Sequence, residues 1–155
     1  MRLSKNFDLD EFRKSVTAIR NGISNEPTKE HIYNIQLLVK YVLQPLRDAL
    51  GKPIKITSGY RSENLNKLIK GSKKSQHTKG MAADIQFKVD GVMNNKMIWD
   101  KVIELDLPFD QMINEFDYSW IHISYNHEHN RRGKLEAYKE SGKTKYKWVE
   151  IEKGI

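Results

Sequence analysis

Residues 75–84 read Ser-Gln-His-Thr-Lys-Gly-Met-Ala-Ala-Asp and contain the most chemically suggestive side chains of the chain. His77 and Asp84 stand seven positions apart, where a polar loop gives way to an apolar stretch. Gly80 permits a tight backbone turn between them. Histidine and carboxylate side chains are the protein ligands of catalytic zinc, which takes three of them and keeps one open position. The stretch therefore supplies two candidate metal ligands.

A third candidate ligand lies downstream in residues 120–124, Trp-Ile-His-Ile-Ser. Strand alternation would place Trp120 and His122 on the same face. His77 and Asp84 could then meet His122 across a sheet. A single histidine on a strand is more often a surface or hydrogen-bonded residue, so spacing alone leaves both interpretations open.

The hydrophobic pattern on either side predicts helices first and strands afterwards, which is typical of an α+β domain with an antiparallel sheet. The expected helices are residues 8–20 with Asp8 as N-cap, residues 28–50 with a kink or break at Pro45, a segment capped by Ser62 and closed by Gly71, and residues 94–106. The expected strands are residues 52–57, 81–89, 109–115 and 120–125, followed by a terminal hairpin of residues 135–139 and 144–151. A chain of 155 residues suits one domain, 1–155, with the N-terminal helices packed on the sheet.

Composition excludes several classes of protein. The chain has no cysteine, so disulfides, thiolate nucleophiles and cysteine-bound zinc are excluded. Aromatic residues make up 10% of the sequence, which favours a folded domain. We expect no membrane span and no secretory signal, because no long apolar run is present and the N-terminus lacks an apolar segment.

Positive charge is concentrated near the candidate ligands. The chain carries 27 Lys and Arg against 20 Asp and Glu, a net charge of +7. Residues 61–79 hold six of these basic residues and one acidic residue. The charge either serves solubility or attracts an acidic partner, such as nucleic acid or a cell-wall polymer.

Four ordered blocks carry a resemblance to a known family. Residues 75–84 resemble the Ser-x-His-x-x-Gly-x-Ala-x-Asp signature of zinc D-Ala-D-Ala carboxypeptidases, a family that includes phage L-alanyl-D-glutamate endopeptidases. Residues 56–62, which contain Ser-Gly-Tyr-Arg, resemble the block upstream of that signature, and residues 109–115 followed by residues 120–124 resemble the block downstream of it. Residues 6–12 are similar to the opening of a short phage-associated branch. The resemblance spans roughly residues 5–150 and implies a fold similar to the Hedgehog signalling domain.

By position, the resemblance implies one zinc ion held by His77, Asp84 and His122. Arg61 matches the family arginine that stabilises a developing oxyanion or holds a substrate carboxylate. A surface salt bridge is the alternative role for Arg61.

The general base is the least regular part of the pattern. Many relatives carry an acidic residue three positions before the last histidine, where this chain has Ser119. Glu115, seven positions before His122, is the better candidate, because a hairpin could bring the two together. Asp117 is the reserve.

Three other residues are expected to bind substrate or line the cleft: Ser75, Gln111 and Trp120. Ser75 could equally serve as a turn residue, and Trp120 as a core residue. We expect the remaining histidines, His31, His127 and His129, to lie on the surface.

The resemblance implies a zinc metallopeptidase that hydrolyses peptidoglycan stem peptides, either as a D-Ala-D-Ala carboxypeptidase or as an L-Ala-D-Glu endopeptidase. Its partner would be the stem peptide, with no nucleic acid. The missing signal suits a phage lysis protein released from the host cytoplasm to the wall, or a virion-associated enzyme.

Two functions of other classes compete with this interpretation. A non-catalytic zinc domain similar to Hedgehog would keep the ligands and lack the base, and Ser119 keeps that option open. A nucleic-acid-binding protein would explain the charge, but no motif of the common nucleic-acid-binding modules is visible.

Overall fold

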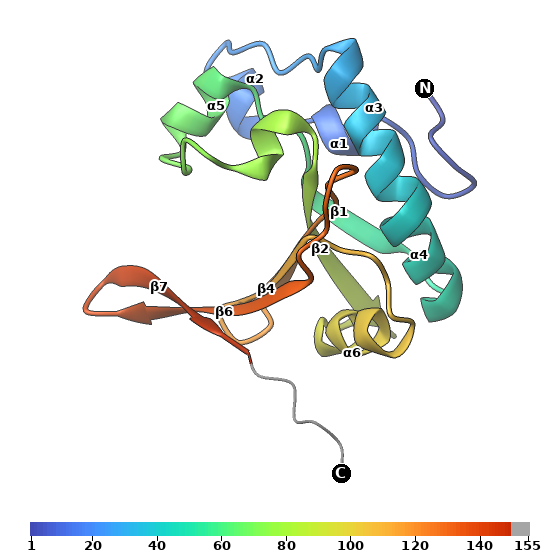
Figure 1. The fold of residues 1–155 in the computed structure, drawn as a ribbon. Helices are drawn as coiled ribbons and strands as arrows, with labels where there is room; N and C mark the ends of the chain where they lie inside the picture. The colour runs from blue at the N-terminus through green and yellow to red at the C-terminus, as the bar shows by residue number, and fades with distance from the viewer. Residues whose placement is uncertain (150–155) are drawn as a thin grey trace.

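The computed structural model describes residues 1–149 and has its longer helices on one face of a mostly antiparallel sheet (Figure 1). The sheet order is β1-β2-β5-β4-β6-β7, and β3 pairs with β2. The strands are β1 (Ile54–Ser58), β2 (Ala82–Val89), β3 (Val92–Met93), β4 (Gln111–Glu115), β5 (Trp120–Ser124), β6 (Gly133–Glu140) and β7 (Lys143–Trp148). The predicted α+β class is confirmed.

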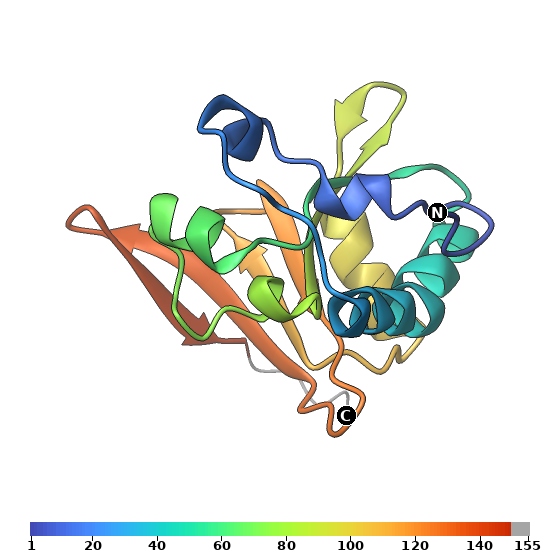
Figure 2. The same ribbon diagram turned by 90° about the horizontal axis from the view of Figure 1, so that it is seen from above.

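Short helices and one long helix cover the sheet (Figures 1 and 2). They are α1 (Asp10–Arg13), α2 (Val16–Arg20), α3 (Lys29–Leu38), the π-helical turn η1 (Val39–Leu43), α4 (Gln44–Leu50), α5 (Glu63–Leu68), the 3₁₀ turn η2 (Gln76–Lys79) and α6 (Lys96–Glu104). In the part of the chain that the structure describes, no helix is both long and apolar enough to cross a membrane.

The single helix predicted over residues 8–20 is wrong, because the segment forms α1 and α2 with a break between them. Ser15 has an extended backbone and caps α2, its hydroxyl accepting the amide of Ala18. Asp8 is not the N-cap of α1; that position is Leu9. Ile19 is 77% exposed, so the apolar spacing that suggested one amphipathic helix does not mark a buried face throughout.

Pro45 does not break the long helix, which continues from Lys29 to Leu50. The amide of Gln44 donates to the carbonyl of Val39, five residues back, and so forms a π-helical turn just before the proline. Proline lacks an amide hydrogen and crowds the preceding turn. A wider turn at this point accommodates both effects within a continuous helix.

The later elements follow the prediction with three differences. The expected loop at residues 72–80 contains η2, the short strand β3 was not predicted, and β6 runs parallel to β4 rather than antiparallel. The terminal hairpin is confirmed as β6 and β7, although residues 150 and 151 of the predicted second strand lie outside the described residues. The parallel pairing arises because β5 ends beside the start of β4, so residues 125–132 only cross that end of β4 before β6 begins on its other side.

The two faces of the sheet have different roles. Alternate strand residues such as Ile85, Met112 and Ile121 pack with the helices to form the main core. The residues between them point to the opposite face. This second face, between the α5–η2 region and the β6–β7 hairpin, carries the candidate site (Figure 1).

Candidate metal centre and active-site cleft

Sheet register places two of the predicted ligands next to each other. Asp84 of β2 lies opposite His122 of β5, and His122 lies opposite Ile113 of β4. Directly opposed residues in a sheet project from the same face. Since Ala83 and Ile123 belong to the helix-side core, Asp84 and His122 project into the cleft.

The third ligand comes from outside the sheet. His77 lies in η2, where the Ser75 hydroxyl accepts its amide and Gly80 ends the turn in the left-handed conformation with φ of 75°. The His77 Nδ1 atom lies 2.7 Å from the carbonyl oxygen of Gly59, and the ring is almost completely buried. A side chain on Gly59 would come within 2.6 Å of the Phe12 backbone, so only glycine lets the chain pass α1 here.

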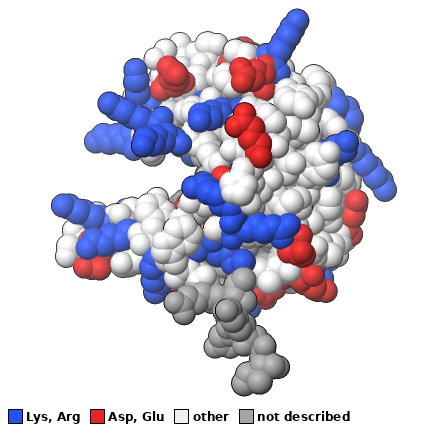
Figure 3. Space-filling view, in the orientation of Figure 1, with Lys and Arg blue, Asp and Glu red and all other residues white. Residues whose placement is uncertain are grey.

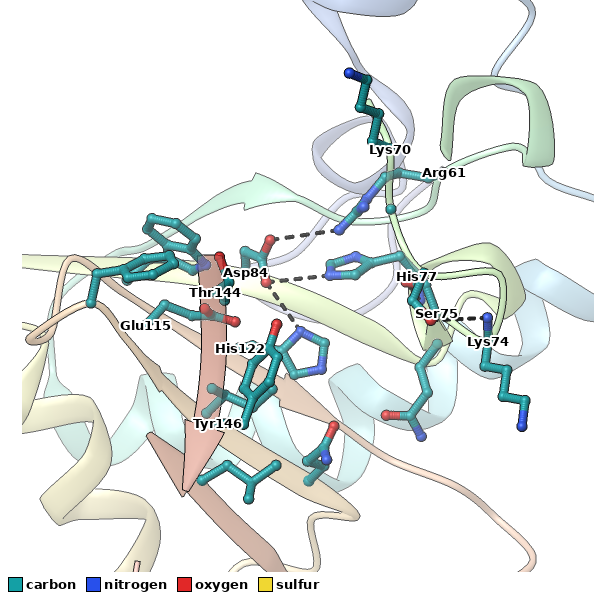
Figure 4. A pocket seen from close by; sticks show the side chains of 18 of the residues that line it. Arg61, Lys70, Lys74, Ser75, His77, Asp84, Glu115, His122, Thr144 and Tyr146 are labelled. Carbon is teal, nitrogen blue, oxygen red and sulfur yellow. Dashed lines mark hydrogen bonds and ion pairs between the residues drawn. The ribbon is translucent and has the colours of Figure 1, made fainter. Parts of the chain in front are cut away.

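Three ligand-type side chains therefore converge on one point (Figure 4). Asp84 Oδ1 lies 3.3 Å from His77 Nε2 and 3.2 Å from His122 Nδ1. One potential ligand atom from each residue lies within 4.8 Å of the other two. Both Nε2 atoms are buried and have no well-aligned hydrogen-bond partner in the described chain.

The protonation states suit a metal ion. Burial alone would raise the pKa of Asp84, but the neighbouring His122 and His77 rings outweigh it and hold that pKa well below its ordinary value. Burial lowers the pKa of His77 and so favours the neutral ring. If His77 Nδ1 donates to Gly59, Nε2 keeps a free lone pair. A carboxylate and a neutral imidazole with a free lone pair are forms that bind zinc, so the residues fit the group.

Arg61 lies beside the ligands. Its Nη2 atom is 3.9 Å from Asp84 Oδ2, and its Nη1 atom donates to Asn66 Oδ1 at 3.2 Å. Its backbone amide donates to the carbonyl of His77. The side chain is 14% exposed and forms no exposed surface salt bridge, so Arg61 is held at the cleft.

Glu115 lies on the same sheet face as His122. It ends β4 two residues after Ile113, the partner of His122, and is itself paired with Trp120. Burial raises the pKa of its carboxyl to about 7, and the charge of Asp84 adds to that effect. A carboxyl with a pKa near neutrality is suited to accept and release a proton. The structure confirms the predicted hairpin of β4 and β5, which places Glu115 on the same sheet face as His122.

A cavity of about 610 Å³ encloses these groups. Ser75, Gln111 and Trp120, the predicted substrate-binding residues, all line it. Figure 3 shows the cleft as a hollow with Lys and Arg side chains along its two lips. Their substrate-binding roles stay predictions, although Ser75 also acts as the cap of η2.

Other candidates lie outside the cavity. Asp117 and Ser119 are exposed in the turn between β4 and β5, and the Ser119 hydroxyl donates to the carbonyl of Phe116. His127 and His129 are exposed in the following loop, and His31 belongs to the capping box of α3. None of these five residues lines the cavity.

Sequence reasoning missed Asp110, a buried carboxylate beside the site. Arg131 binds it with Nε at 3.0 Å and Nη2 at 2.9 Å, and Gln76 donates to it at 2.8 Å. Gln76 immediately precedes His77, so Asp110 ties η2 to the start of β4. The only sequence signal was its place in the Phe-Asp-Gln block of residues 109–111.

Asp110→Asn should reduce the free energy of unfolding by about 2 kcal/mol, because hydrogen bonds to charged groups contribute roughly 1.5–3 kcal/mol. Burial raises the pKa of Asp110, but the hydrogen bonds from Arg131 and Gln76 outweigh it and lower the pKa below its ordinary value. The stabilisation is therefore present above pH 4 or so and lost as the pH falls through the lowered pKa. Urea unfolding of metal-free protein at pH 7 and pH 3 checks both statements. Equal losses at the two pH values would contradict them.

Comparison with known proteins agrees with the geometry. The Peptidase M15 family profile matches residues 5–124, a range that includes all three candidate ligands, Arg61 and Glu115. No curated protein matches the sequence. The match covers more than half of the chain and ends with β5, so it leaves out the β6–β7 hairpin. The chain belongs to the M15 peptidase family.

Proposed function

We propose that this protein is a zinc metallopeptidase that hydrolyses peptide bonds in peptidoglycan stem peptides. The observation that carries the proposal is the buried group of His77, Asp84 and His122 at the bottom of an open cleft. Membership of the M15 family supports peptidase activity. The choice of stem peptides rests on the resemblance of four sequence blocks to wall-cleaving relatives.

His77, Asp84 and His122 would hold the zinc ion, which supplies a Lewis acid and lowers the pKa of water toward 7. Glu115 would accept the proton of the attacking water and return it to the amine that leaves. Arg61 would stabilise the negative charge that develops on the scissile carbonyl oxygen, or hold a substrate carboxylate. The buried walls around these groups would strengthen each of these interactions.

Charge around the cleft supports an acidic substrate. Lys70 and Lys74 line it on the α5–η2 side. Stem peptides carry free carboxylates, which these cations would attract. The proposal includes either removal of a terminal D-Ala or cleavage of an internal L-Ala-D-Glu bond.

Digestion of purified peptidoglycan by the zinc-loaded protein, with products identified by mass spectrometry, tests the proposal. Free D-Ala would identify a carboxypeptidase, and release of peptides that begin with D-Glu would identify an endopeptidase. The matched control is Asp84→Asn, which lacks one ligand charge. If the protein binds zinc but cleaves no stem peptide, it is a non-catalytic zinc domain and the proposal fails.

Arg61→Lys should lower kcat/KM by about 100-fold, the usual loss when one donor to a developing oxyanion is removed. Lysine keeps the charge but lacks the planar fork that reaches Asn66 and Asp84 together. Steady-state kinetics on a stem peptide measure the effect, and circular dichroism should show an unchanged fold. Arg20→Lys, an exposed residue of α2 outside the cavity, is the matched control. Wild-type kinetics for Arg61→Lys would remove Arg61 from the site.

A further inference from the structure

The β6–β7 hairpin forms one wall of the cleft although it lies beyond the family match. Strand β7 alternates strictly, with Lys143, Lys145 and Lys147 on one face and Thr144, Tyr146 and Trp148 on the other. Thr144 and Tyr146 line the cavity. The second face of β7 is therefore turned toward the site, and the lysine face is turned away from it.

Register connects Tyr146 directly to the proposed base. Tyr146 lies opposite Ala137 of β6, Ala137 lies opposite Glu115 of β4, and Glu115 lies opposite Trp120 of β5. The four side chains thus form one row on the cleft face of the sheet. Ala137 is buried and small, so no bulky group separates Tyr146 from Glu115.

Tyr146 lines the same cavity as the three candidate metal ligands and Arg61. Figure 4 draws it with Asp84, His122 and Arg61 among the side chains of that cavity. The residue is 55% exposed, so a substrate in the cleft can reach it. The ordinary pKa of a tyrosine hydroxyl is about 10, so this hydroxyl keeps its proton at neutral pH and can donate a hydrogen bond.

We propose that Tyr146 is a catalytic residue whose hydroxyl donates a hydrogen bond to the scissile carbonyl oxygen of the substrate, from the wall of the cleft that faces Arg61. The inference rests on the proposed function, because it assigns a role in peptide hydrolysis. A neutral donor and a cationic donor on two sides of the carbonyl would together stabilise the charge that develops during attack. The hairpin would thus complete a site that the family-matched part of the chain leaves open.

Tyr146→Phe isolates the hydroxyl, because the ring and its strand position are kept. We expect kcat on a stem peptide to fall about 100-fold with little change in KM, since the bond strengthens only as charge develops. Zinc content should stay at the wild-type level. Tyr138→Phe is the matched control, because Tyr138 lies on the opposite face of β6 and outside the cavity. Its kinetics should equal those of the wild type.

A peptide phosphinate, which mimics the tetrahedral stage of hydrolysis, gives a second measurement by calorimetry. Tyr146→Phe should bind it about 100-fold more weakly than the wild type does. Wild-type kcat and phosphinate affinity in Tyr146→Phe would overturn the inference, as would a loss confined to KM or an equal loss in Tyr138→Phe. If the wild-type protein cleaves no peptide, the proposed function fails, and phosphinate affinity alone then decides whether Tyr146 contacts the carbonyl oxygen.

Discussion

Replacing one histidine of the metal centre, by His77→Ala or His122→Ala, is expected to abolish both zinc binding and peptide hydrolysis. Each change leaves two ligands where catalytic zinc requires three. Zinc content, measured by mass spectrometry of metals after dialysis, should fall from one ion per chain to near zero. Activity should fall to background in the same samples.

Because the ligands are buried, the experiment needs a control that distinguishes loss of the metal from loss of the fold. His77 is 2% exposed, and its ring is hydrogen-bonded to the Gly59 carbonyl. His77→Ala therefore removes packing and a hydrogen bond as well as a metal ligand. Asp84→Asn keeps the shape of the side chain and removes the charge, which separates metal loss from misfolding. Zinc should raise the melting temperature of the wild type and leave that of Asp84→Asn unchanged. His129→Ala, an exposed histidine outside the cavity, should behave as the wild type does. Full zinc content and full activity in either ligand variant would show that the ligand assignment is wrong.

The ligand group was predictable because its residues lie in ordered sequence blocks that resemble a known family, whereas spacing alone left the site open. Strand alternation placed Trp120 and His122 on one face, and the structure has both in the cleft. Ordered blocks then linked His77 and Asp84 to that strand: the pairing of β2 with β5 brings Asp84 to His122, and η2 brings His77 to both. Glu115 followed from the same logic, since a strand, a turn and a second strand predict a hairpin.

Long-range register was not predictable in the same way. The parallel pairing of β4 with β6 depends on the path of residues 125–132, which have no periodic pattern. Tyr146 could not be assigned to the cleft until that register was known. Its local pattern, alternating with lysines, shows two different faces but not which of them faces the site.

The hydrophobic pattern also gave a wrong prediction at the N-terminus, where it indicated one amphipathic helix. Val16 and Ile19 have helical spacing with Phe12, yet they are exposed while Phe12 is buried. Helical spacing of apolar residues marks a buried face only where the helix is continuous, and here the extended backbone at Ser15 interrupts the helix.

The π-helical turn before Pro45 was also not predictable from local sequence. Val39, Val42 and Leu43 pack in the core, and this packing holds the helix together across the proline.

Glu115→Gln is expected to lower kcat by about 100- to 10,000-fold, the usual contribution of a general base. Glutamine keeps the size of the side chain and its place at the end of β4 but cannot accept a proton. Because Glu115 is not one of the three ligands, zinc content and fold should be retained.

Asp117→Asn is the matched control for Glu115→Gln, since it makes the same chemical change two residues away. Asp117 is exposed in the turn and does not line the cavity, so its variant should keep activity close to that of the wild type. The opposite ranking of the two variants would transfer the role of base to Asp117. Near-wild-type activity in both variants would mean that another residue is the base. Ser119 stands at the usual acidic position but could not take that role, because it is exposed and its hydroxyl donates a hydrogen bond to the carbonyl of Phe116. A loss confined to Glu115→Gln, with zinc retained, would instead show that this chain keeps its base seven residues before the last ligand, on the neighbouring strand of the same sheet face.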